Sequence, residues 1–151
     1  MASYYGVNHT KAFVNVPSEK IDVSAWKGRM RWVYDEISLA GAVALNEKIY
    51  LGIIPKQAKV VEAILAFSDL GAAGVMDLGY EKVDSSLSSD QDAFLAAVDV
   101  NSAAGTKKMS DQANMVGFGL ELDGDAYIVA KATTATTAAG TLKCAVCYVL
   151  D

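Results

Sequence analysis

Residue types that build most enzymes, metal sites and disulfide-stabilised folds are scarce in this sequence of 151 residues. It has two cysteines and one histidine, which is too few for a disulfide framework and leaves a four-ligand zinc site short of soft ligands. A nucleophile activated by histidine would have to use His9, and no residue near it in the sequence is an evident orienting partner. No general acid–base pair and no phosphate-binding glycine motif stands out either. We therefore expect no catalytic residue, no metal and no cofactor, and we predict that the protein is not an enzyme.

Long apolar runs and clustered positive charge are also missing. No segment approaches the ~20 apolar residues of a membrane helix, and the N-terminal MASYYGVNHTKAF lacks the basic and apolar regions of a signal peptide. The formal net charge is −5 and the sequence pI is about 4.8, whereas phosphate binding needs clustered lysine and arginine. We therefore expect no membrane partner and no direct contact with nucleic acid.

The composition is that of a folded protein. Hydrophobic residues make up 52% of the chain and charged residues 21%, which excludes a disordered or coiled-coil chain. The length is typical of one domain, and we find no linker, repeat or charge block that would divide it. We predict a single domain over residues 1–151, with residues 1–12 as an extended N-terminal arm.

Alternation of apolar and polar residues, typical of strands, dominates the chain. Turn signals separate most of the segments with this pattern. The segments are eight in number: residues 10–16, 27–37, 47–54, 57–68, 73–81, 118–122, 127–131 and 141–151. Many short strands and little helix predict an all-β fold, either an antiparallel β-sandwich or a closed barrel.

Two local patterns look especially clear. Residues 118–122 and 127–131 alternate on either side of Asp123-Gly124, which is typical of a β-hairpin whose tight turn needs positive φ angles. Residues 90–100, DQDAFLAAVDV, give the one predicted short helix, with Asp90 as its N-cap and Phe94, Leu95 and Val98 as its apolar contacts.

One segment fits two structures. In residues 53–71, IIPKQAKVVEAILAFSDLG, a helix would have Pro55 in its first turn and would end at Gly71. A strand would instead alternate residues such as Val61 and Leu65 against Val60 and Ile64. The local pattern alone predicts an amphipathic helix.

The two cysteines lie in KCAVCYV, inside a strand pattern. Redox-active C-x-x-C pairs lie at the start of a helix, where the helix dipole lowers the thiol pKa. In a strand, Cys144 and Cys147 point to opposite faces. We expect two buried, unreactive thiols.

Residues 27–37 alternate two kinds of side chain. The basic row is either an ordinary solvated face or a docking surface for an acidic protein; it consists of Lys27, Arg29 and Arg31. The other face of the strand is apolar and aromatic, with Met30, Trp32 and Tyr34. The aromatic side chains of Trp26, Trp32 and Tyr34 could stack on a sugar, so a carbohydrate-binding β-sandwich is an alternative.

Four segments are informative through their order along the chain: KIYLGIIPKQAKVVEAILAF, GVMDLGYE, SSDQDAFLAAVDVNSAAG and LDGDAYIVAKATTATTAAGTLKCAVCYVLD. From Lys48 onward, this order resembles the small virion structural proteins of tailed bacteriophages that decorate or cement a capsid. The resemblance implies a jelly-roll-like β-sandwich of about eight strands, and it favours the strand for residues 57–68.

The resemblance also implies a role and partners. Such a protein binds the major capsid protein on the capsid surface of the virion, after synthesis in the host cytoplasm, and is often a homo-oligomer, with a trimer favoured. A tail or head-fibre component is the alternative within the virion. The expected partner-binding residues are Tyr4 and Tyr5 in the N-terminal arm and the basic row Lys27, Arg29 and Arg31.

Overall fold

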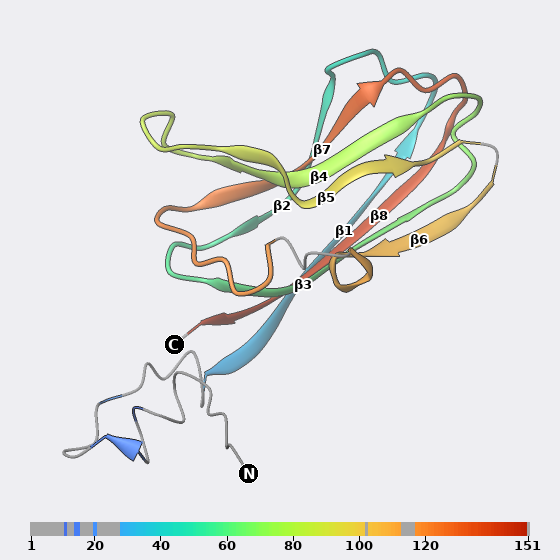
Figure 1. The fold of residues 1–151 in the computed structure, drawn as a ribbon. Helices are drawn as coiled ribbons and strands as arrows, with labels where there is room; N and C mark the ends of the chain where they lie inside the picture. Colours follow the sequence, from blue (N-terminus) through green and yellow to red (C-terminus); the bar gives the residue numbers. More distant parts are fainter. Residues whose placement is uncertain are drawn as a thin grey trace, which may run out of the picture.

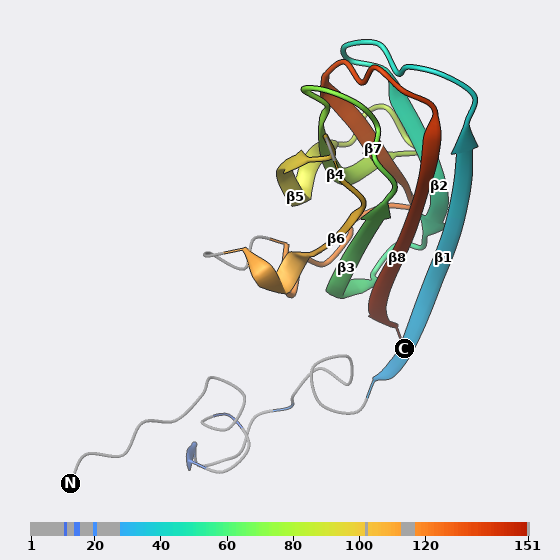
Figure 2. The same ribbon diagram turned by 90° about the vertical axis from the view of Figure 1, so that its right-hand side faces the viewer.

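A computed structural model of the chain describes residues 28–101, 103–112 and 117–150, together with Lys11, Val14, Asn15 and Lys20. The described elements are eight strands and one short 3-10 turn (Figures 1 and 2). The strands are β1 (Arg29–Leu39), β2 (Lys48–Ile54), β3 (Lys59–Phe67), β4 (Val75–Lys82), β5 (Asp90–Asp99), β6 (Gly105–Lys108), β7 (Ala126–Thr134) and β8 (Gly140–Leu150), and the turn is η2 (Met109–Asp111).

The strands form two four-stranded antiparallel sheets. Their orders are β1-β8-β3-β6 and β2-β7-β4-β5, and the sheets lie face to face in Figure 2. The antiparallel pairs β1–β8, β2–β7, β3–β6 and β4–β5 are those of one long hairpin rolled into a sandwich, which is the jelly-roll arrangement. The predicted all-β sandwich is therefore confirmed.

The core lies between the two sheets. In strands such as β2 and β3 its side chains come mostly from alternate positions, because successive residues of a strand point to opposite faces. The largest fully buried ones include Leu51, Ile54, Val60, Leu65, Leu78, Phe94, Ile128 and Leu142. Burial of each such side chain contributes about 1.5–3 kcal/mol to folding, so the sandwich has an ample core for its size.

The segment that fits two structures, residues 53–71, contains a strand. Pro55 follows β2, a turn comes next, and β3 pairs with β8 along one side. On its other side β3 pairs with β6 at Ile64–Phe67. Gly71 lies in the next turn at φ +86°, where a Cβ would overlap the side chain of Thr137. Tertiary pairing decides against the local helix signal.

The predicted helix over residues 90–100 is wrong, because this segment is strand β5. The pairing of β5 with β4 shifts register twice, and Ala97 adopts a positive φ of 51°. Irregularities of this kind let consecutive residues turn inward, and Ala93, Phe94 and Leu95 are all buried. The spacing that suggested a helix reflects a bulged strand.

The predicted hairpin around Asp123-Gly124 is also wrong. Residues 117–122 run beside β3 instead of β7: the Gly119 N–H donates to the Val60 carbonyl and the Val60 N–H donates to the Leu120 carbonyl, both at 2.8 Å. The positive φ angles fall at Gly117 and Gly119, not at Gly124.

Six of the eight predicted strands are observed, as β1, β2, β3, β4, β7 and β8. Residues 118–122 contribute only an isolated bridge from Glu121 to Lys59, and the predicted strand over residues 10–16 falls mostly outside the described residues. Strands β5 and β6 bring the number of described strands to eight. Within the described ranges, no helix has the length and apolar character needed to cross a membrane.

Candidate interaction surface

The outer face of β1 carries a row of large exposed side chains. Met30, Trp32 and Tyr34 are 62%, 55% and 60% exposed. The register places Trp32 opposite Cys147 and Tyr34 opposite Ala145, so the row lies on the face of the sheet that points away from the core. Contiguous exposed apolar and aromatic side chains of this kind mark interaction surfaces. We call Met30, Trp32 and Tyr34 the β1 row.

The inner face of β1 fastens the strand to the sandwich. Val33 lies opposite the buried Val146 and meets β2 at Gly52, where a Cβ would overlap the Val33 side chain. Further along, Ile37 and Leu39 pack against the core. The backbone under the β1 row is thus held in place while the row itself stays accessible.

Polar contacts orient the end of the row. The Tyr34 hydroxyl donates to Glu36 Oε2 at 2.9 Å, and Lys143 Nζ lies 3.4 Å from the same oxygen. The hydrogen bond to the carboxylate raises the pKa of Tyr34. The hydrogen bonds from Tyr34 and Lys143 lower the pKa of Glu36.

The predicted basic row lies on the other side of the same strand. Arg29 and Arg31 share a face with Val33, because alternate residues of a strand point to the same side. Both are exposed, because the N-terminal part of β1 runs past the second sheet (Figure 1). Neither arginine forms an ion pair with a residue in the described ranges. Of the other predicted contact residues, Tyr4, Tyr5, Trp26 and Lys27 lie outside those ranges.

The cysteines have the geometry that the strand pattern predicts. Cys144 and Cys147 are free thiols and buried, and they point to opposite faces of β8. Burial raises the pKa of Cys144 to about 12. Burial and the nearby Glu62 carboxylate raise the pKa of Cys147. Both sulfurs are therefore poor nucleophiles at neutral pH.

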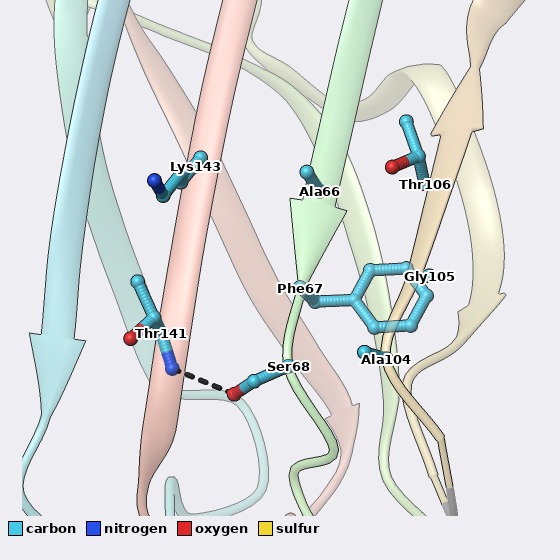
Figure 3. Close-up of a pocket in the computed structure, with 8 residues that line it drawn as sticks. All are labelled: Ala66, Phe67, Ser68, Ala104, Gly105, Thr106, Thr141 and Lys143. Atoms are coloured by element: carbon cyan, nitrogen blue, oxygen red, sulfur yellow. Dashed lines mark hydrogen bonds between the residues drawn. The ribbon is translucent and has the colours of Figure 1, made fainter.

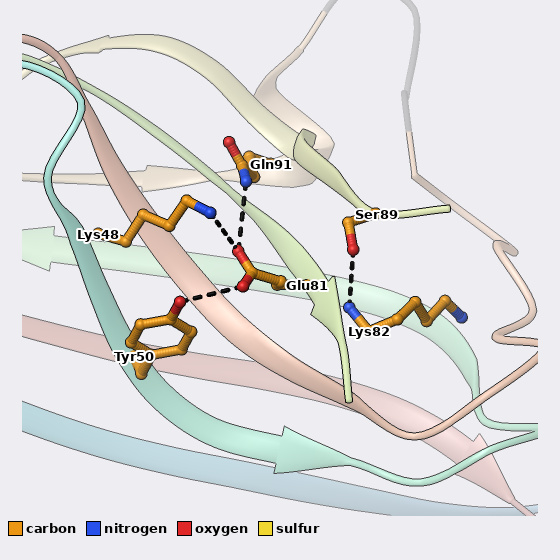
Figure 4. Close-up of polar contacts among 6 residues, drawn as sticks. All are labelled: Lys48, Tyr50, Glu81, Lys82, Ser89 and Gln91. Carbon is orange, nitrogen blue, oxygen red and sulfur yellow. Dashed lines mark hydrogen bonds and ion pairs between the residues drawn. The ribbon is translucent and has the colours of Figure 1, made fainter. Parts of the chain in front are cut away.

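A second exposed patch lies on the outer face of the other sheet. Tyr50 and Ile53 of β2 and Tyr127 of β7 are half-exposed, and the two tyrosine rings meet edge to face with centroids 5.7 Å apart. Glu81 holds this patch in place: it accepts from Lys48 Nζ at 2.6 Å and from the Tyr50 hydroxyl at 3.0 Å (Figure 4).

The buried charge in the same sheet has a structural role. Lys82 is 5% exposed and pairs with Asp123, whose pKa it lowers. Its ammonium also lies 5.0 Å from the centre of the Tyr80 ring, and its backbone N–H donates to the Ser89 hydroxyl at 2.9 Å (Figure 4). These contacts tie the loop after β4 and the start of β7 to the sheet.

A shallow hollow of about 460 Å³ opens on the outer face near β6 (Figure 3). Its lining is Ala66, Phe67, Ser68, Ala104, Gly105, Thr106, Thr141 and Lys143. The Ser68 hydroxyl accepts the Thr141 N–H at 2.8 Å, and Lys143 is the one charged group of the lining. Nothing in this lining pairs a nucleophile with a base. Among the described residues, no group of three or more His, Cys, Asp or Glu side chains could hold a metal ion.

Sequence reasoning did not single out Met30 or the patch of Tyr50, Ile53 and Tyr127 as surface features. The alternation within each strand identified which residues share a face. It could not identify which face points outward, because that depends on the position of the second sheet.

Comparison with solved structures finds phage capsids. A chain in the capsid of Ralstonia phage GP4 is similar with a TM-score of 0.65 and 25% identity, over 82% of this chain and 86% of that one. A chain of the cyanophage Pam1 capsid has a TM-score of 0.59 and 19% identity over 83% and 88%. A chain of the Helicobacter pylori bacteriophage KHP30 capsid has 0.50 and 18% over 80% and 87%. No protein-family model and no curated protein sequence matches this chain.

All three of these solved structures are phage capsids. The GP4 likeness extends over most of both chains and supports a phage capsid-related protein. The Pam1 and KHP30 likenesses support the fold. The fold and the comparisons therefore point to a structural component of a phage particle.

Proposed function

We propose that the protein decorates the outside of a phage capsid and cements the lattice that the major capsid protein forms. The observation that carries this proposal is the similarity to a chain in the GP4 capsid over most of both chains. A rigid two-sheet sandwich suits the role, because it presents fixed surfaces that can bridge neighbouring capsid subunits. The added interface area would resist the pressure of packaged DNA.

The β1 row offers an exposed contact surface for such binding. Aromatic residues and methionine are enriched in protein interfaces and give much of their binding energy. Trp32 and Tyr34 are already oriented on a regular strand, so little conformational entropy is lost when a partner covers them. Many copies on one lattice would add avidity to individually modest contacts.

The basic row and the N-terminal arm complete the proposed contacts. Lys27, Arg29 and Arg31 would face an acidic part of the capsid and favour one orientation of approach. The arm over residues 1–12, as an extension of a single domain, would order on the capsid with Tyr4 and Tyr5 as anchors. Deletion of residues 2–10 should then lower capsid occupancy, and unchanged occupancy would remove the arm from the proposal.

Self-association on the particle belongs to the same proposal. The resemblance to decoration proteins favours a trimer on the capsid surface. No cofactor and no catalysis is part of the role.

Binding to phage heads tests the proposal. Heads that lack the protein would be mixed with purified chain, sedimented and imaged by electron cryomicroscopy. We expect co-sedimentation and density for the sandwich on the outer capsid surface. Absence of the protein from heads contradicts the proposal, and density on the tail or on a fibre would favour that alternative.

A carbohydrate-binding module is a second candidate, favoured by the exposure of Trp32 and Tyr34 on one face of β1. Rings two residues apart on a strand can stack on a sugar. A glycan array with the intact protein should show a binder whose signal falls in a Trp32→Ala variant. An array without a binder would dismiss this candidate.

A further inference from the structure

Strand β1 is an unusually open sheet edge. It has 11 residues and pairs with β8 over its whole length without a register shift. The other edges are protected: β6 has four residues, and the pairings of β2 and β5 are interrupted by shifts. Long regular edges present unpaired backbone groups to other chains, and proteins normally avoid them.

The outward backbone groups of β1 belong to its even-numbered residues. The Ser68 N–H donates to the Thr141 carbonyl and the Thr141 N–H donates to the Ser68 hydroxyl, so Thr141 turns its backbone toward β3. Backbone N–H and C=O groups point to opposite sides at successive residues of a strand, so the even residues of β8 direct theirs toward β1. These residues pair with the odd residues of β1, whose backbone groups therefore point toward β8. The backbone groups of the even residues of β1 then point away from the sheet. The Glu36 N–H accordingly donates to the Asp35 carboxylate at 2.8 Å instead of to a strand.

The sequence of β1, RMRWVYDEISL, is complementary to itself when it runs antiparallel. We propose that β1 pairs with β1 of a second copy about a two-fold axis at Val33. In this register Arg31 faces Asp35 of the second copy, and Trp32 faces Tyr34 of the second copy. Each contact occurs twice. Paired aromatic residues and paired opposite charges across strands both stabilise a sheet.

Charge disfavours parallel pairing and favours this register over one centred on Tyr34. Arg31 and Asp35 are both exposed, and neither forms an ion pair inside the described part of the chain. Parallel pairing in register would set each of these charges against its own copy, which is unfavourable. Moving the axis to Tyr34 would place Arg31 opposite Ile37 and leave Asp35 opposite Val33. The charges on β1 therefore disfavour some strand pairings at this edge and allow the proposed one.

The geometry leaves room for the second copy. In Figure 2, β1 forms the margin of the molecule, outside β2. On pairing, the Glu36 N–H would donate to the Met30 carbonyl of the second copy, and the Asp35 carboxylate would be released to Arg31. The two outer faces would join into one continuous sheet surface that carries both β1 rows.

This contact goes beyond the proposed function and does not rest on binding to a capsid. An antiparallel edge pair is two-fold, so a trimer on the particle would have to use other surfaces. The two ideas can therefore fail separately.

A charge swap tests the pairing. We expect the wild-type chain to sediment in solution at twice its 15.9 kDa. Arg31→Asp and Asp35→Arg should each weaken the dimer by about tenfold or more, because each places like charges together twice. The double variant Arg31→Asp/Asp35→Arg should restore it. Lys107→Asp on the β6 edge is the matched control and should leave the dimer intact.

A backbone variant tests the hydrogen bonds separately. Tyr34→Pro removes an outward N–H but no bond to β8, so we expect a folded monomer with the far-ultraviolet circular dichroism of the wild type. A wild-type monomer or trimer overturns the proposal. So does a dimer that both single swaps leave unchanged, or a double variant no better than the single ones.

Discussion

Strands β1 and β5 each end a sheet, and they do so in opposite ways. β1 pairs without interruption and exposes Met30, Trp32 and Tyr34. β5 shifts register twice and buries three consecutive residues, Ala93–Leu95. A straight edge keeps strict alternation and therefore carries one outward row. A bulged edge turns its apolar residues inward, and its deformed backbone is a poor template for another strand.

Local polar contacts reinforce the difference. The irregular turn of β5 at Ala97 is held by Asp77, whose carboxylate accepts the Ala97 N–H at 2.7 Å. On β1, the Asp35 carboxylate occupies only the neighbouring N–H of Glu36. We conclude that β5 serves the stability of the sandwich, whereas the edge and outer row of β1 stay exposed.

The largest expected effect is on stability at β5. Phe94 is fully buried beside Tyr80, so Phe94→Ala should lower the free energy of unfolding by about 3–5 kcal/mol. The same change at Phe118, which is 55% exposed, is the matched control and should have little effect. Urea unfolding measures both. Equal losses at the two sites would contradict the assignment of β5 to the core.

The close approach of β4 to β5 can be broken at Gly79. A Cβ at this position would overlap the backbone of Asp90 and Gln91, so Gly79→Ala should cost about 1–3 kcal/mol in unfolding free energy. Gly41→Ala, where a Cβ meets no atom within 4 Å, is the control. A Gly79→Ala variant as stable as the control would show that the two strands separate easily.

At β1 the expected effect is on binding, not on stability. Trp32→Ala should change the free energy of unfolding by about 1 kcal/mol or less, because the side chain is more than half exposed. Its occupancy on phage heads should fall by about tenfold, as for a central interface aromatic. Phe118→Ala should keep wild-type occupancy. If both variants bind equally well, the β1 row is not the contact.

Labelling of the two thiols of β8 measures how well the sheet beside β1 is covered. Burial raises the pKa of Cys144 to about 12 and also raises that of Cys147, so both remain protonated at pH 8. Neither should react with iodoacetamide in the native protein, and both should react in denaturant. In Trp32→Ala we expect faster labelling of Cys147, which lies opposite Trp32, but not of Cys144. Mass spectrometry of peptides reads out each site, and rapid native labelling of Cys144 would contradict its burial.

The smallest expected effect is electrostatic. The hydrogen bond from Lys48 lowers the pKa of Glu81 below its ordinary 4.5. A carboxylate with a lowered pKa adds stability above its unfolded-state pKa and loses it as the pH falls through the folded-state pKa. Stability should therefore hold from pH 7 to about 5 and decline below 4.5. Glu81→Gln should remove less than about 1 kcal/mol at pH 7 and flatten that decline in urea titrations. A variant with the wild-type profile would contradict this role for Glu81.

The sequence predicts regular strands better than irregular ones. Alternation in residues 27–37 and 141–151 predicted β1 and β8 and the burial of both cysteines. The helix predicted over residues 90–100 was wrong, because a bulged strand gave Phe94, Leu95 and Val98 a helical spacing. The hairpin predicted at Asp123-Gly124 was wrong because residues 117–122 pair with β3. A local turn signal does not determine which strand a segment pairs with.

The candidate surface was predictable only in part. The residues of the β1 row share a face by alternation alone, and Trp32 and Tyr34 already suggested a stacking surface. That this face points outward, and that β1 is an edge, follows from the rolled hairpin that brings β8 beside it. The roles of Tyr4, Tyr5, Lys27, Arg29 and Arg31 in binding stay predictions.

Hydrogen exchange of the two edge strands tests the central claim most directly. Mass spectrometry would follow peptides that cover β1 and β5, in dilute protein and with phage heads or a high concentration of the chain added. We predict that amides of β1 become protected when a partner is present while those of β5 stay unchanged. Exchange in β1 that no partner slows, or protection that appears in β5 instead, would contradict the claim that β1 is the edge for partners.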